Sequence, residues 1–116
     1  MQIYKAPPVL FINLKRFKSN DSYYKDKLED KVIFPIEDLE LSYKILSNLD
    51  EEGKAKEEIH YKLYAVSNHY GGMGFGHYTA YAQNAGNGNW YDFDDSSVSP
   101  VDSQEVITDA AYNQHR

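Results

Sequence analysis

One stretch near the C-terminus constrains the fold more than any other: a glycine-rich run, a histidine, and two segments typical of neighbouring strands. Residues 71–76 contain four glycines and lead directly into His77. The residues after the histidine are aromatic and β-branched and predict a strand, and residues 90–95 predict a second one. Turn-forming residues lie between them, so the pattern predicts an antiparallel hairpin that returns Asp94 and Asp95 toward the histidine.

The position of the intervening turn decides which carboxylate faces His77. Directly opposed residues in an antiparallel pair have Cβ atoms about 4.5–5.5 Å apart, within reach of a hydrogen bond. A loop over 84–88 that is centred between residues 85 and 86 places His77 opposite Asp94, and one centred on residue 86 places it opposite Asp95. A tight turn at 87–88 would take both acids away. The sequence permits the wider loop without demanding it.

A histidine held by a carboxylate can act as a general base. The neutral imidazole takes a proton from a thiol or hydroxyl, and the carboxylate fixes the tautomer and stabilises the imidazolium. A structural pair at the surface is the plainer alternative and the more common one for such a pairing alone. A metal site built from His69, His77, Asp94 and Asp95 lacks the usual ligand spacing. The glycine run also lacks the pattern of a phosphate-binding loop.

Composition narrows the class of protein. The chain has 116 residues, a length for one small domain, and a net charge of -6, which argues against nucleic acid or an anionic membrane as partner. A basic protein or peptide fits better. The chain has no cysteine, so it holds neither disulfides nor thiolate zinc sites, which is compatible with a cytoplasmic or nuclear protein. No apolar run approaches the ~20 residues of a membrane span, and the first residues are too polar for a signal peptide.

The remaining pattern predicts a mostly β domain with little helix. The segments expected as strands are 9–17 (largely buried), 32–35 (an edge strand), 39–41 and 61–69. Residues 18–27 read as a surface loop, and 47–59 as a solvated, mobile insertion. Ser103 is expected to N-cap a short helix through residues 104–107.

Several of these segments, in this order, resemble the C-terminal half of the catalytic domain of ubiquitin-specific proteases, the papain-like cysteine deubiquitinases. The matching residues are Pro8–Phe17, Val32–Pro35, Tyr64–Gly72, Gly76–Tyr81 and Trp90–Val101. They cover most of the chain outside its two polar loops. The fold implied is the antiparallel sheet of the palm-like half of a papain-like cysteine protease, whose parent fold is α+β, with few short helices.

The resemblance implies a role for each matching residue. His77 would be the general base, Asp94 its orienting partner and Asp95 a supporting carboxylate. Residues 18–26 and 68–76 look like the two blocking loops of the family, the second of which covers the tail of ubiquitin. The residues that would bind this tail are Asn68, His69, Tyr70, Gly71, Gly72, Gly74, Gly76 and Tyr78. No cofactor and no metal are expected.

The chain also departs from the family pattern. The box with the nucleophilic cysteine and the cysteine pairs that bind zinc are absent, and residues 113–116 replace an apolar final strand. The implied function is therefore that of one part of a deubiquitinase, inactive alone, which partners ubiquitin, ubiquitinated proteins and a cysteine-bearing N-terminal half. The alternative is a non-catalytic ubiquitin-binding or scaffold module on the same fold.

Overall fold

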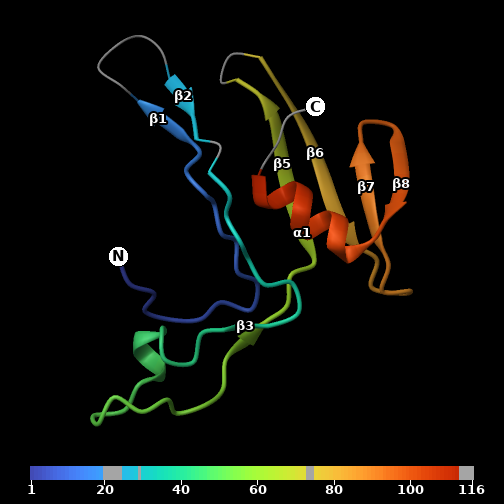
Figure 1. The fold of residues 1–116 in the computed structure, drawn as a ribbon. Coiled ribbons are helices and arrows are strands. Elements are labelled where there is room, and N and C mark those ends of the chain that lie inside the picture. The colour runs from blue at the N-terminus through green and yellow to red at the C-terminus, as the bar shows by residue number, and fades with distance from the viewer. Residues whose placement is uncertain (20–24, 29, 73–74, 113–116) are drawn as a thin grey trace. The chain divides into compact units, whose positions relative to one another are not determined.

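The computed structural model describes residues 1–19, 25–28, 30–72 and 75–112, and the chain forms two compact units. One unit comprises Met1–Asn13 and Pro35–Leu63, and the other Leu14–Phe34 and Tyr64–Arg116. The second unit carries the candidate site. The described residues form ten elements (Figure 1): β1 Phe17–Ser19, β2 Lys25–Lys27, β3 Leu39–Glu40, the 3-10 helix η1 Leu46–Asn48, β4 His60–Tyr61, β5 Ala65–Gly71, β6 Gly76–Gln83, β7 Trp90–Asp94, β8 Ser97–Val101 and α1 Ser103–Tyr112.

The first unit is built around the antiparallel pair of β3 and β4. The buried Asn48 links two segments of this unit, because its amide donates to the carbonyls of Ser42 and Glu57 at 2.8 Å each. The expected insertion 47–59 is mostly exposed, and its tip is a turn in which the Asp50 carboxylate accepts two backbone N–H groups. Its mobility stays a prediction.

The second unit contains a four-stranded antiparallel sheet in the order β5-β6-β7-β8, with the helix α1 across one face (Figure 1). Alternation along the strands places Asn68, Thr79, Tyr81 and Trp90 on a common face, and each of them is buried. Val106 of α1 is fully buried as well. We call this side of the sheet the helix face and the opposite side the outer face. The predicted mostly β, antiparallel architecture is confirmed.

The strand predicted over 9–17 is wrong for all but its last residue. Residues 10–16 lie outside any strand, and Val9, Phe11 and Ile12 are 62%, 84% and 60% exposed. Apolar alternation indicates strand propensity, but a strand also needs a run of backbone hydrogen bonds to a neighbour. Here the pairing with β2 begins at Phe17, and the Arg16 carbonyl extends it by one bond from the N–H of Leu28. Residues 32–35, predicted as an edge strand, also lie outside any strand.

Other boundaries differ in ways that hydrogen bonds explain. The strand predicted over 61–69 is two strands, β4 and β5, because Leu63 donates to the Ile36 carbonyl while the Tyr64 carbonyl accepts from Gln83. The loop predicted over 18–27 begins and ends as the paired strands β1 and β2, with residues 20–24 outside the described part.

The helix begins one residue earlier than predicted and runs further, to Tyr112. Its cap is Asp102 rather than Ser103, because the Asp102 carboxylate accepts the N–H of Glu105 at 2.9 Å. The short strand predicted at 39–41 is confirmed as β3.

Candidate active site

The structure brings His77 and Asp94 together. The Nε2 atom of His77 lies 2.6 Å from Oδ1 of Asp94, and both side chains lie on the helix face, each about half exposed. His77 is the second residue of β6 and Asp94 the last residue of β7, so two adjacent strands hold the pair.

The register that produces this contact is not the one expected. The last paired residues are Ala80 and Phe93, and continuing the same register one step places Thr79, not His77, across from Asp94. His77 therefore reaches Asp94 diagonally along the strands, and direct opposition to Asp94 or to Asp95 is wrong. Diagonal neighbours on one face remain within reach of a long side chain.

The loop between β6 and β7 explains the shift. Asn84 donates its backbone N–H to the Asn89 carbonyl at 2.8 Å, so the loop is centred between Gly86 and Asn87. The Asn84 side chain holds it there by accepting the N–H groups of Gly86 at 2.7 Å and Asn87 at 3.2 Å. Gly88, with a φ of 74°, supplies the left-handed residue before the strand resumes.

Asp95 sits beside the pair in the turn between β7 and β8, because Asp94 already pairs with Ser97. Its φ of 50° lies in the left-handed region, which aspartate tolerates better than most residues in a two-residue hairpin turn. Asp95 therefore contributes its charge to the site from outside the strand.

These carboxylates set the protonation of His77. The hydrogen bond to Asp94 raises the pKa of His77 first of all, and the charges of Asp94 and Asp95 raise it further, against a smaller opposing effect of burial. An ionised carboxylate only accepts, so Nε2 carries the shared proton. The nitrogen left to take a proton from a nucleophile is Nδ1.

The same three residues also offer one ligand atom each within 4.8 Å of one another, as a divalent cation would require. Both carboxylates stand at an exposed edge, and Nε2 of His77 is already committed to Asp94. The arrangement therefore favours a shared proton over a metal, and the expectation of no metal stays a prediction.

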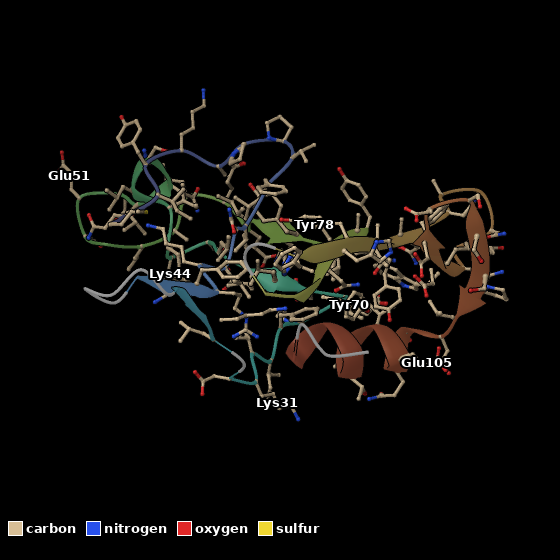
Figure 2. All side chains as sticks on the ribbon, turned by 90° about the horizontal axis from the view of Figure 1, so that it is seen from above. Lys31, Lys44, Glu51, Tyr70, Tyr78 and Glu105 are labelled. Carbon is tan, nitrogen blue, oxygen red and sulfur yellow. The ribbon has the colours of Figure 1, made fainter. Side chains whose placement is uncertain are left out.

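The residues predicted to bind a ubiquitin tail divide between the two faces of the sheet. Tyr70 pairs directly with His77 and lies on the side of α1, while Tyr78, which is 67% exposed, lies on the opposite side (Figure 2). Asn68 on the helix face is 2% exposed and His69 on the outer face 9% exposed, so neither side chain is open to a peptide. The exposed positions are Gly71, Gly72 and Gly76, and Gly74 lies outside the described residues.

Sequence reasoning missed the packing that surrounds His69. Phe17 of β1 and Tyr78 contact its ring, and Lys27 of β2 donates to its carbonyl at 2.7 Å. The period of two along β5 and β6 was the available signal, because it places His69 and His77 on opposite faces once the glycine run is taken as the turn of a hairpin.

Comparison with known proteins identifies the family. The family model described as ubiquitin carboxyl-terminal hydrolase matches residues 1–114. The chain is 47% identical over 112 residues to human ubiquitin carboxyl-terminal hydrolase 15, and 46% identical over 112 residues to Arabidopsis thaliana ubiquitin carboxyl-terminal hydrolase 9. These matches cover 97% of this chain but only 11% and 12% of the relatives.

Solved structures agree with the sequence matches. The chain superposes on the Ubp8-Sgf11-Sgf73-Sus1 SAGA DUB module with a TM-score of 0.78 and 31% identity, over 96% of this chain and 24% of that one. The same module bound to ubiquitin aldehyde gives a TM-score of 0.73 and 31% identity, over 84% and 21%. Among the described residues no helix is long and apolar enough to cross a bilayer. The predicted resemblance is confirmed, and the chain belongs to the ubiquitin carboxyl-terminal hydrolase family.

Proposed function

We propose that His77 and Asp94 are the base and the orienting acid of a thiol-dependent ubiquitin hydrolase whose cysteine lies outside these 116 residues. The observation that carries the proposal is the 2.6 Å bond between Nε2 of His77 and Asp94, which leaves Nδ1 for a thiol. Membership of the family supports the same roles. The chain itself has no cysteine, so we expect it to show no hydrolysis alone.

In the proposed reaction Nδ1 of His77 takes the thiol proton, and the thiolate attacks the carbonyl carbon of the last ubiquitin glycine. The imidazolium then gives its proton to the leaving amine, and a thioester remains. A water molecule, deprotonated by the same nitrogen, hydrolyses the thioester and restores the thiol. Asp94 holds the ring throughout, and the raised pKa of His77 favours the imidazolium that must pair with a thiolate.

The exposed glycines support a role in holding the ubiquitin tail. Gly71, with a φ of 90°, turns the backbone away at the end of β5, and Gly72 follows it without a side chain. Such backbone lets an extended peptide approach closely. We propose that the backbone of residues 71–76, rather than the side chains of Asn68 and His69, contacts the tail of ubiquitin.

The proposed partners follow from the proposal that the reactive cysteine lies outside these 116 residues. We propose that the chain acts with a cysteine-bearing N-terminal half of the same catalytic domain, on ubiquitin and ubiquitinated proteins. The apolar side chains exposed over residues 9–14 offer a surface for that half. A cytoplasmic or nuclear location stays a prediction.

A complementation assay tests the proposal. The chain is mixed with a cysteine-bearing N-terminal half from the family, and release of a fluorophore from the ubiquitin C-terminus is followed. We expect turnover only in the mixture, and none with His77→Ala. His60→Ala is the matched control, because His60 forms a comparable 2.7 Å bond to Asp38 within the other compact unit. Binding of ubiquitin without restored turnover would instead favour the non-catalytic module.

A further inference from the structure

The ring of His69 is enclosed by aromatic side chains on the outer face of the sheet. Its centroid lies 5.5 Å from that of Phe17, with the two planes at 70°, and 4.8 Å from that of Tyr78. The residue is 9% exposed. Contacts of this geometry are favourable edge and tilted arrangements of rings, so the imidazole is held in place on two sides.

On a third side the ring lies against the backbone of Gly76. A Cβ added to Gly76 would fall 2.9 Å from both Cδ2 and Cε1 of His69 and nearer still to Nε2. The φ of Gly76 is not in the left-handed region, so the position requires glycine for space and not for backbone freedom. The two residues are complementary in shape.

The backbone of His69 is anchored as well. Nζ of Lys27, in β2, donates to the His69 carbonyl at 2.7 Å, and Lys27 pairs with Phe17 of β1. The ring therefore cannot swing outward without disturbing both Phe17 and Tyr78.

This packing acts on the weakest part of the hairpin. The last rung between β5 and β6 pairs Gly71 with Gly76, two residues without side chains to pack across the strands. Glycine also gains the most backbone freedom when a strand end frays. Tyr70 and His77 form the next rung, so fraying at Gly76 would move His77 directly.

We infer that His69 is a positioning residue for His77: its ring, wedged between Phe17, Tyr78 and the Gly76 backbone, holds the start of β6 so that His77 meets Asp94. The assignment rests on the proposed function for what His77 does. His69 does not touch the reacting groups, because it lies on the other face of the sheet. Burial, and then the charge of Lys27, lower its pKa, so it stays neutral as a packing group.

The experiment is an NMR titration of the histidines in the full 116-residue chain with His69→Ala, Gly76→Ala and the double variant. We expect the pKa of His77 to fall toward the ordinary value of 6.5 in each single variant, and an unchanged titration of His60. Gly76→Ala should also lower the unfolding midpoint when His69 is present but not in the His69→Ala background, since the ring that collides with the new Cβ is then gone.

If the pKa of His77 stays as high as in the parent chain in folded Gly76→Ala and His69→Ala chains, the inference is overturned. Additive effects of the two substitutions on the unfolding midpoint of the double variant would overturn it as well. Should His69→Ala fail to fold, Gly76→Ala alone decides, because it displaces the ring without removing it. The readout needs no turnover. A shifted His77 pKa together with failed complementation would therefore defeat the proposed function and leave the positioning role standing.

Discussion

Replacing Val106 by alanine tests whether α1 supports the sheet that carries the site. Val106 is fully buried on the helix. The change removes two methyl groups, worth about 1.6 kcal/mol at about 0.8 kcal/mol each. A cavity that does not collapse adds roughly 1 kcal/mol, so the expected cost is about 2–3 kcal/mol. That is a large share of the roughly 5–15 kcal/mol by which small domains are stable.

Urea unfolding followed by the fluorescence of Trp90 measures this cost. Trp90 is the sole tryptophan, is 4% exposed and lies on the helix face, so its emission reports on this unit. With a slope of about 1.5–2 kcal/mol per molar urea, the midpoint should fall by about 1–2 M. Val9→Ala is the matched control: Val9 is 62% exposed, and we expect a change within about 0.5 kcal/mol. Equal midpoints for the two variants would show that α1 does not pack on the sheet.

Three further outcomes are expected. Asp94→Asn should lower the pKa of His77, seen by NMR titration, because the charged acceptor that raises it is lost; an unchanged pKa would contradict the pairing. Because its pKa is raised, His77 stabilises the fold fully below the unfolded histidine pKa of about 6.5, and this stabilisation is lost as the pH rises through the folded value. His77→Gln should therefore lose less stability than the parent chain as the pH rises above about 6.5. The pKa of His69 is lowered, chiefly by burial, so its effect on stability is opposite to that of His77. His69 destabilises the fold as the pH falls below the pKa of a histidine in the unfolded chain. Asp102→Ala should cost about 0.5–2 kcal/mol and Ser103→Ala much less in urea unfolding, and the reverse order would restore Ser103 as the cap.

Local signals in the sequence were sufficient where an element is defined by its own residues. The glycine run, the aromatic alternation after it and the turn residues near 84–88 correctly predicted β6, β7 and the connection between them. Residues 9–17 carry equally strong strand signals and form almost no strand. A strand is completed by a neighbour, and neither propensity nor alternation names one.

The pair of His77 with an acid was predictable, but its geometry was not. The choice between Asp94 and Asp95 depended on the centre of a loop that is rich in turn residues at every position. Backbone bonds between Asn84 and Asn89 fix that centre. Nothing in residue type alone ranks such bonds against a turn shifted by one residue.

The hydrophobic core resolves the same choice in a way that loop chemistry does not. His77 and Tyr81 are four residues apart on one strand, and Trp90 and Asp94 are four apart on the next, so each pair shares a face. Any register that buries Tyr81 and Trp90 together under the helix therefore puts His77 and Asp94 on that face, whatever the loop length. A slip of one residue would bring Asp95 to the histidine but would turn Trp90, now 4% exposed, to the outer face. The burial of one tryptophan thus selects which carboxylate His77 meets.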